Sequence, residues 1–164
     1  MLQSVEDFIK YFESIRRRTM NYIEAIPEDK IDWSPQEGQF TCGEIVRHIA
    51  GAEQMYAGIF TQGRWNYPED IHHRQGSLAD TITLLESVHT QSMNALRIMD
   101  DTELSHPRPL IDGSPIKAWR ILMMMVEHEI HHRSQLAMYL MLMGVEPPQI
   151  YGMKMEEAIA RMTG

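Results

Sequence analysis

The sequence predicts an all-α protein, a four-helix bundle followed by a short C-terminal helical turn. Four long stretches repeat apolar residues at i, i+3 and i+4, which is the period of a helix with one buried face. Each stretch carries residues typical of helix starts or stops, and the alternating pattern of strands is nearly absent. A helix of ~20 residues is ~30 Å long, so four helices and a turn near residues 155–162 account for the chain. We therefore expect one bundle domain over residues 1–164.

The first helix is expected from Ser4 to about Ala25. Ser4 can act as the N-cap, and the acidic residues Glu6 and Asp7 favour the positive end of the helix dipole. Pro27 ends the helix because proline cannot continue it. The apolar stripe consists of Val5, Phe8, Ile9, Phe12, Ile15, Met20 and Ile23.

The second and third helices begin at capping residues. Thr41 and Glu44 form a Thr-x-x-Glu capping box, in which each side chain satisfies the other residue's backbone N–H. An apolar stripe with Ile45 and Ile49 follows it. The third helix is expected to start at Ser77 and to run to about residue 99.

The fourth helix is expected to start at Ser114-Pro115, an N-cap followed by proline in the first helical position. It continues to Met143, where Gly144 can adopt the left-handed conformation that stops a helix. The longest connection is residues 100–113.

Composition excludes several classes of protein. The 164 residues include 15 Lys and Arg against 23 Asp and Glu, a net charge of −8, which argues against a nucleic-acid partner. The basic run Arg16–Arg18 is interpreted as a solvated helix face. A single cysteine, Cys42, excludes an internal disulfide framework. The first residues lack the pattern of a signal peptide, and the longest aliphatic run is residues 121–126, so we expect a cytoplasmic protein without a membrane partner.

Two histidines occupy one face of the fourth helix. His128 and His132 are one turn apart, about 40° around the axis, so their imidazoles can converge on one cation. Ile121, Met125 and Tyr139 fall in the same sector. The pair is therefore predicted to face the interior of the bundle.

His48 lies on the apolar stripe of the second helix and should also face the core. Together with His128 and His132 it would supply three neutral nitrogen ligands, which is the pattern of a catalytic metal site with an open position. Imidazoles suit Zn, Ni, Cu or Fe better than Mg or Ca. We predict one divalent transition-metal ion per chain, with Zn²⁺ or Ni²⁺ as the expected ions.

Each histidine also has a purely structural interpretation. His48 alone could be a hydrogen-bonded core residue, and the pair on the fourth helix could be a polar patch at a subunit interface. His72 and His73 are expected in a solvated connection. His89 and His106 have no partner at a suitable spacing, so no role is predicted for either.

The same stretch satisfies the HExxH pattern of zinc peptidases, with Glu129 as general base. No histidine follows His132 to complete such a site, and no strand-rich half is present to build a substrate cleft. Glu129 lies about 60° around the helix from His132. Glu129 remains a catalytic candidate, either by contacting a metal ligand without binding the metal itself or by transferring protons.

Two segments resemble the DinB-like proteins, also called the DinB/YfiT superfamily. One runs from His128-x-x-x-His132-Arg133-Ser134-Gln135-Leu136 through Tyr139-Leu140 to Met143-Gly144-Val145-x-Pro147-Pro148. The other runs from Trp33-Ser34-Pro35 through Phe40-Thr41-x-Gly43-Glu44-Ile45 to His48-Ile49-Ala50. The resemblance covers essentially the whole chain.

The resemblance implies a four-helix bundle with a metal-binding histidine triad, carried over onto His48, His128 and His132. His131 is outside that triad, beside it or at the surface. The family includes metal-dependent S-transferases and isomerases that use low-molecular-weight thiols such as bacillithiol or mycothiol. Its name reflects damage-inducible expression, so a link to the stress response is implied, and homodimers are implied as well.

Three functions are therefore open: a metal-dependent enzyme that activates a thiol or water toward a small molecule, a stress-linked metal-binding or sensing module without turnover, and a structural bundle.

Cys42 lies in a first helical turn, where thiolate is favoured, but packing beside the capping box explains it better. Nine of the 14 methionines follow Arg120. They are explained equally by core filling, a dimer face, or a soft lining for apolar substrates.

Overall fold

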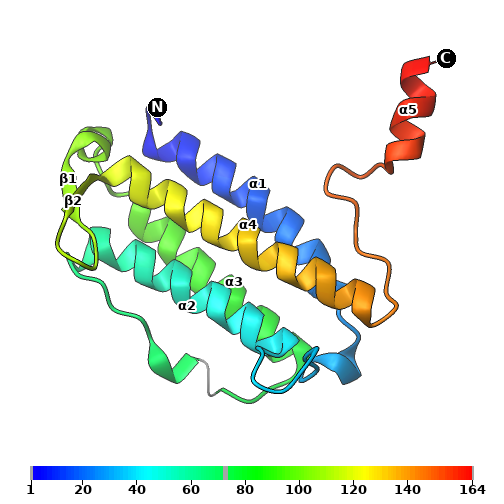
Figure 1. Cartoon of the computed structure of the whole chain (residues 1–164). Helices are drawn as coiled ribbons and strands as arrows, with labels where there is room; N and C mark the ends of the chain where they lie inside the picture. The colour runs from blue at the N-terminus through cyan, green and yellow to red at the C-terminus, as the bar shows by residue number, and fades with distance from the viewer. Residues whose placement is uncertain (1, 72–73, 164) are drawn as a thin grey trace.

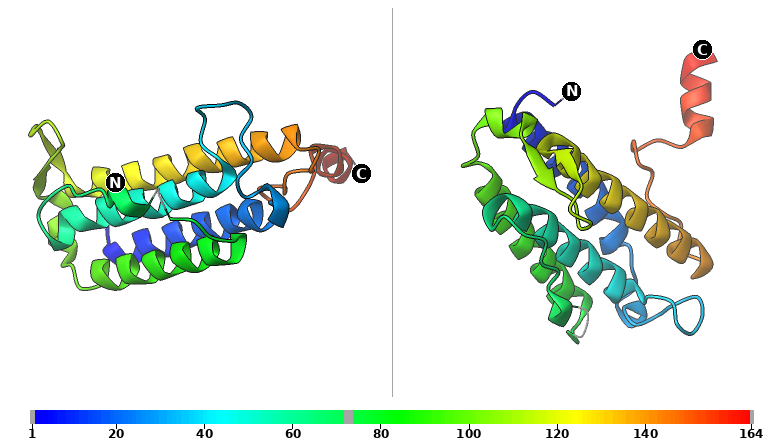
Figure 2. Two further views of the ribbon diagram at one scale, coloured as in Figure 1. Left: turned by 90° about the horizontal axis from the view of Figure 1, so that it is seen from below. Right: turned by 60° about the vertical axis from the view of Figure 1, so that its left-hand side comes forward.

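The computed structural model describes residues 2–71 and 74–163. Four helices of 19 to 25 residues run along one another (Figure 1), which confirms the predicted bundle. These are α1 (Val5–Glu24), α2 (Cys42–Thr61), α3 (Leu78–Leu96) and α4 (Ala118–Leu142). A fifth helix, α5 (Met155–Thr163), stands where the C-terminal turn is expected and projects away from the bundle (Figure 2).

Local hydrogen bonds fix most of the predicted helix ends. The Ser4 hydroxyl accepts from the backbone N–H of Asp7, and both halves of the Thr41–Glu44 capping box are formed. Ser77 forms a second capping box with Asp80. Gly144 has a φ of +77°, the left-handed conformation expected after the last helical residue. The end of α3 was predicted at about residue 99, whereas the helix ends at Leu96.

The predicted start of the fourth helix at Ser114-Pro115 is wrong. The Asp112 carboxylate accepts from both the backbone N–H and the hydroxyl of Ser114, so this serine closes a turn instead of capping a helix. Strand β2 (Pro115–Lys117) then pairs antiparallel with β1 (Pro107–Pro109), and α4 begins at Ala118. This short hairpin lies at the end of the bundle where α4 starts and α2 finishes (Figure 1). Within residues 2–71 and 74–163, the remaining elements are three 3₁₀ turns: Glu28–Lys30, Glu69–Ile71 and Asp101–Ser105.

The apolar core is divided into two clusters along the bundle axis. One contains Tyr22, Ile45, Leu85 and Leu140 at the end distant from the hairpin. The other is built around the stacked rings of Phe8 and Phe12 at the opposite end. A polar layer separates them, and it holds Glu53 and Glu129, the most deeply buried carboxylates of the described residues.

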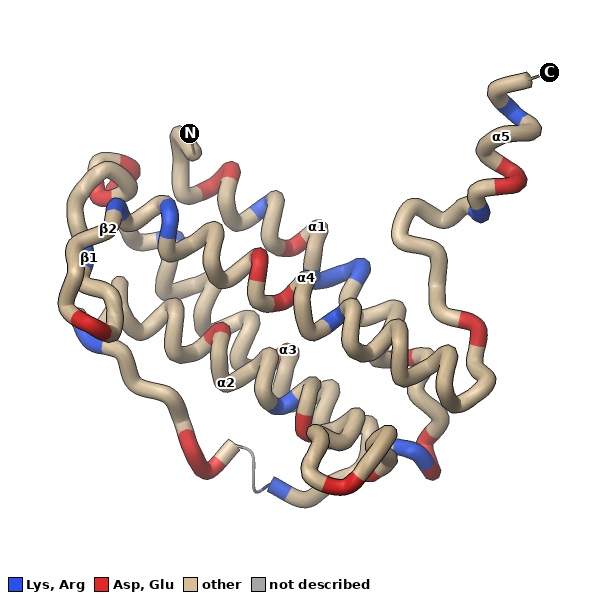
Figure 3. Tube along the Cα trace, in the orientation of Figure 1, with Lys and Arg blue, Asp and Glu red and all other residues tan. Residues whose placement is uncertain are grey.

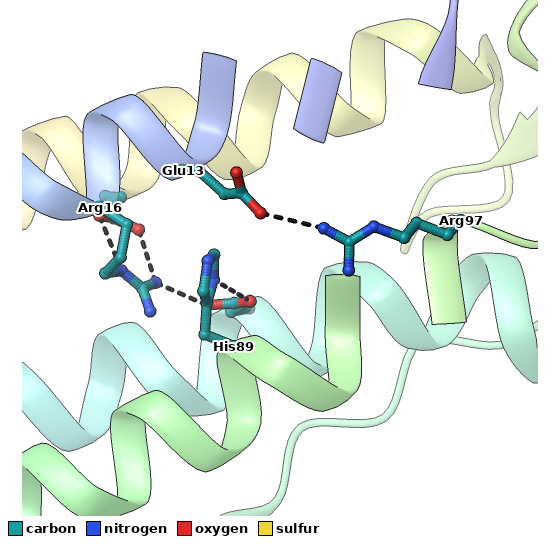
Figure 4. A network of polar contacts seen from close by, with 6 residues as sticks. Glu13, Arg16, His89 and Arg97 are labelled. Atoms are coloured by element: carbon teal, nitrogen blue, oxygen red, sulfur yellow. Dashed lines mark hydrogen bonds and ion pairs between the residues drawn. The ribbon is translucent and has the colours of Figure 1, made fainter. Parts of the chain in front are cut away.

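This polar layer consists of Arg16, Glu53, His89 and Glu129, one residue from each long helix. Arg16 Nη2 donates to Glu53 at 2.6 Å and to Glu129 at 2.7 Å, and Arg16 Nε donates to the other oxygen of Glu129 at 3.0 Å. His89 Nδ1 lies 3.0 Å from the second oxygen of Glu53. Figure 4 shows Arg16 and His89 converging from α1 and α3. Burial alone would raise the pKa of Glu53, but Arg16 and His89 outweigh it and lower that pKa below its usual value.

Two predictions are corrected by this layer. The Arg16–Arg18 run is not wholly a solvated face: Arg17 is exposed, Arg18 lies over the Tyr151 ring, and Arg16 is buried between two carboxylates. His89, for which no role was predicted, contributes a hydrogen bond to the layer.

Away from this layer, charged residues are distributed over separate elements. Figure 3 shows Lys and Arg interleaved with Asp and Glu. Among the described residues, none of the helices combines the length and the apolar character needed to cross a membrane.

We expect Arg16→Met to destabilise the fold by about 3–5 kcal/mol, because it leaves two carboxylates buried without their cation. The exposed neighbour offers a matched control: Arg17→Met should change the free energy of unfolding by less than about 0.5 kcal/mol. Urea unfolding followed by circular dichroism measures both. Equal effects of the two substitutions would show that the polar layer does not hold the bundle together.

Candidate metal centre

The structure brings His48 of α2 together with His128 and His132 of α4. His128 Nε2 lies 3.1 Å from His48 Nε2 and 3.2 Å from His132 Nε2. The ligand atoms of all three rings lie within 4.8 Å of one another. Two nitrogens bound at ~2.0–2.1 Å to one tetrahedral ion are ~3.3–3.4 Å apart, so little movement is needed to coordinate a metal. The juxtaposition expected from helical spacing is therefore present.

The opposite nitrogens of two rings are held by side chains that sequence reasoning did not single out. His132 Nδ1 lies 2.6 Å from Gln135 Oε1, and His48 Nδ1 lies 3.1 Å from the Tyr67 hydroxyl. When Nδ1–H donates to Gln135, the Nε2 of His132 carries a lone pair directed at the centre of the triad. Such partners orient histidine ligands in metal sites. The contact of Gln135 could have been predicted from the sequence, because Gln135 lies about one helical turn after His132. The contact of Tyr67 could not, because Tyr67 comes from a loop with no regular spacing to His48.

Gly51 allows Tyr67 to reach His48. A Cβ at this position would lie 2.7 Å from the Tyr67 hydroxyl and 2.9 Å from Ile71, closer than packed atoms approach. Glycine within a helix costs about 0.5–1 kcal/mol relative to alanine. The helix bears this cost at Gly51 because the missing side chain lets Tyr67 lie against α2, about one turn after His48.

Aromatic side chains surround the triad. The Phe40 ring lies 5.5 Å from that of His48, and the Tyr56 ring lies 6.0 Å from that of His128. Tyr139 donates its hydroxyl to the Phe40 carbonyl at 3.0 Å, which fixes the loop before α2 over the triad. These side chains cover parts of the triad, in which His132 is buried and His48 and His128 are partly exposed.

Burial keeps His128 and His132 neutral. It is the largest cause that lowers the pKa of His128, and the nearby rings of His132, His48 and His131 act in the same direction, so the pKa falls to about 3. Burial also lowers the pKa of His132, whereas the hydrogen bond that His132 Nδ1 makes to the Gln135 amide oxygen raises it. Neutral imidazole is the form that binds a metal, so the donor set fits a divalent transition metal at neutral pH.

Glu129 faces away from this centre. Both of its carboxylate oxygens accept from Arg16, and the residue is 2% exposed. The catalytic role predicted for Glu129, beside the metal ligands or as a general base, stays a prediction. The ion pair with Arg16 disfavours it, because both carboxylate oxygens are already engaged.

Other candidate residues lie outside the triad. Cys42 is fully buried, and burial raises the pKa of its thiol to about 11, which agrees with a packing role. His131 is exposed, with its ring 4.9 Å from that of His132, and His106 contacts Glu103. His72 and His73 are outside the described residues.

The model of the DinB family matches residues 1–162. The chain belongs to the DinB family. It is similar to the uncharacterized protein YjoA of Bacillus subtilis strain 168, with 25% identity over 158 residues, which is 94% of this chain and all of YjoA. The crystal structure of that DinB-like protein has a TM-score of 0.71 at 23% identity and covers 88% of this chain and 96% of its own.

Two further solved structures share the DinB fold. YfiT from Bacillus subtilis is described as a probable metal-dependent hydrolase with an unusual four-helix bundle topology. It matches at 18% identity with a TM-score of 0.68, over 87% of this chain and 89% of its own. The H52A mutant of a mycothiol-dependent maleylpyruvate isomerase matches at 18% identity and a TM-score of 0.58, over 80% of this chain and 60% of that chain. At these identities the likeness shows the fold alone.

The depressed pKa of His128 predicts acid sensitivity of the metal-free DinB protein. Between the unfolded value near ~6.5 and the folded value of about 3, the unfolded chain binds a proton that the folded chain does not. Stability is therefore present above that window and is lost as pH falls through it. We expect the melting temperature to fall between pH 7 and pH 5, before the buried carboxylates, whose unfolded pKa is ~4.3, contribute much.

The matched variant is His128→Asn, whose melting temperature should change less between pH 7 and pH 5 than that of the wild type. The measurement is thermal unfolding by circular dichroism in the presence of a chelator. Identical slopes for the wild type and the variant would contradict the assignment of the proton uptake to His128.

Proposed function

We propose that this DinB-family protein binds one divalent transition-metal ion, Zn²⁺ or Ni²⁺, through His48, His128 and His132, and acts on a small molecule as a metal-dependent enzyme. The observation that carries the proposal is the convergence of three Nε2 atoms, with separations of 3.1 and 3.2 Å between neighbours. Three protein ligands leave a coordination position for a substrate or cofactor.

The chemistry we propose is activation of a low-molecular-weight thiol, such as bacillithiol, for S-transfer to an electrophile. A divalent ion at the triad would lower the pKa of a coordinated thiol, or of water. The chain contributes the orientation of the rings through Tyr67 and Gln135, and aromatic side chains that cover parts of the triad. Because Cys42 is buried and protonated, the reacting sulfur would come from a cofactor. The mycothiol dependence of the isomerase with this fold agrees with a thiol, and the description of YfiT agrees with water.

The alternative is a stress-linked metal-binding or sensing module without turnover, which requires the same triad. A peptidase of the HExxH type is disfavoured, because its general base would be Glu129 and both oxygens of that carboxylate accept from Arg16. We also propose that the protein acts in the cytoplasm without a nucleic-acid or membrane partner, supported by the net charge of −8.

Metal content tests the triad. We expect untagged protein, after purification and dialysis, to retain close to one equivalent of Zn²⁺ or Ni²⁺ by mass spectrometry of the metals. His132→Ala should lose most of it, and His106→Ala, at a histidine outside the triad, should not. Metal at 100 times its Kd should stabilise the fold by about 2.7 kcal/mol. Wild-type protein that takes up no metal and gains no stability would refute the proposal.

Turnover separates an enzyme from a binding module. In the assay, 1-chloro-2,4-dinitrobenzene reacts with bacillithiol, glutathione or cysteine: the thiolate forms the C–S bond and chloride leaves, with a change in absorbance. We expect acceleration by the metal-loaded wild type with at least one thiol and none by His132→Ala. Metal binding without acceleration for any thiol would favour the sensing module.

We propose further that the protein is a homodimer. The support is apolar surface that the described chain leaves exposed on α4 and α5, namely Met138, Met141, Leu142, Met155, Ile159 and Met162. Light scattering should give twice the 19.1 kDa mass of the chain. Ile159→Glu should shift the mass toward the monomer, and Ile98→Glu, at an exposed isoleucine elsewhere, should not. A monomeric wild type would exclude the dimer.

A further inference from the structure

An apolar cavity lies beside the histidine triad. Its volume is about 390 Å³, and Met55, Tyr56, Trp65, Ile111 and Met124 contribute to its lining. It is open to solvent, and its lining residues come from the last turns of α2, the loop after α2, the first turns of α4 and the tip of the β1–β2 hairpin. Figure 1 shows these segments at the same end of the bundle. The volume falls in the ~300–1,000 Å³ range of small-molecule sites.

Tyr56 connects this cavity to the metal centre. Its ring lies 5.6 Å from that of Trp65, which also lines the cavity, and 6.0 Å from that of His128. Met124 is one helical turn before His128, so it lies on the same face of α4. A molecule held in the cavity would therefore lie against a ring that also neighbours His128.

The hairpin tip that borders the cavity is held in place before any ligand binds. Trp65 Nε1 donates to the Pro109 carbonyl at 2.8 Å, which ties the loop after α2 to β1. Within the turn, the Leu110 N–H donates to the Ser114 carbonyl, and Gly113 has a φ of +83°. Asp112 Oδ1 accepts from both the N–H and the hydroxyl of Ser114, which holds this carboxylate within the turn.

Ile111 at this tip has no structural explanation within the chain. It is 77% exposed although it borders an apolar cavity on a fixed turn. A large apolar side chain at such a rim gains free energy only when something apolar covers it.

We propose that this cavity binds the apolar part of the substrate, an aromatic ring, and that Tyr56, Trp65, Met124 and Ile111 determine this specificity. Aromatic walls favour offset or edge-on contact with a ring, and methionine sulfur packs well against ring edges. The assignment to a substrate depends on the proposed function, whereas the binding of an aromatic group by the cavity does not.

The experiment uses full-length, metal-free protein labelled with ¹³C at the methionine methyl groups and titrated with benzyl alcohol. Met55→Leu and Met124→Leu assign the two cavity signals. We expect these signals to shift and saturate, together with the His128 ring protons at the same Kd. Met20 and Met138, which do not line the cavity, should not show saturable shifts. Cyclohexylmethanol, similar in size without an aromatic ring, should bind several times more weakly.

Substitutions at exposed positions keep the test independent of folding. Ile111→Asn should weaken benzyl alcohol binding about fivefold or more. Ile98→Asn should leave it unchanged, because Ile98 is 86% exposed and does not line the cavity. Equal affinity of the two alcohols, equal effects of the two substitutions, unchanged His128 signals, or shifts that never saturate would each overturn the proposal.

Metal uptake makes the two hypotheses separable. His132→Ala should lose the metal and keep the cavity's affinity for benzyl alcohol. A wild type that binds benzyl alcohol at Met55 and Met124 but takes up no metal would overturn the proposed function alone. A wild type that binds metal but shows no saturable shift of these methionines would overturn the aromatic cavity alone.

Discussion

The rest of the bundle depends on one buried guanidinium. Arg16 of α1 binds carboxylates from α2 and α4, and His89 of α3 hydrogen-bonds to one of them, so all four long helices meet in the polar layer. Charges buried in this way are costly unless their partners are in place. The two carboxylates therefore keep their contacts with Arg16 in only one axial arrangement of the helices. If one helix slipped along its axis by one turn, ~5.4 Å, Glu53 or Glu129 would lose its cation.

This constraint extends to the metal centre through the two helices that share it. Glu129 directly follows His128, and Glu53 is five residues after His48. Apolar contacts of the two core clusters tolerate small rotations, because methionine and isoleucine can repack. The ion pairs tolerate less: a rotation of α4 that moved His128 and His132 away from His48 would also move Glu129 away from Arg16. We interpret the polar layer as the feature that sets the register of the triad.

The sequence predicted features that depend on local pattern and missed those that depend on contacts between distant segments. Capping residues such as Thr41 and Ser77 act on their own first turn, so their role can be read directly. His48 was found because it is polar on an apolar stripe. The same criterion applies to Arg16, four residues after Phe12, but the neighbouring arginines suggested a solvated face. Tyr67 and the hairpin could not be predicted, since one depends on the close approach permitted at Gly51 and the other on cross-strand pairing of proline-rich segments.

The geometry of the triad itself argues for a cation. With His132 Nδ1–H donating to Gln135, the Nε2 of that ring is an acceptor, and it faces His128 Nε2 at 3.2 Å. His128 Nε2 also lies 3.1 Å from His48 Nε2. In a neutral imidazole a ring nitrogen either carries one proton or offers one lone pair, so His128 Nε2 cannot form a full hydrogen bond to both neighbours at once. A fold that fixes its helices through Arg16 cannot relieve this by moving the rings apart, whereas a divalent ion would satisfy all three nitrogens together.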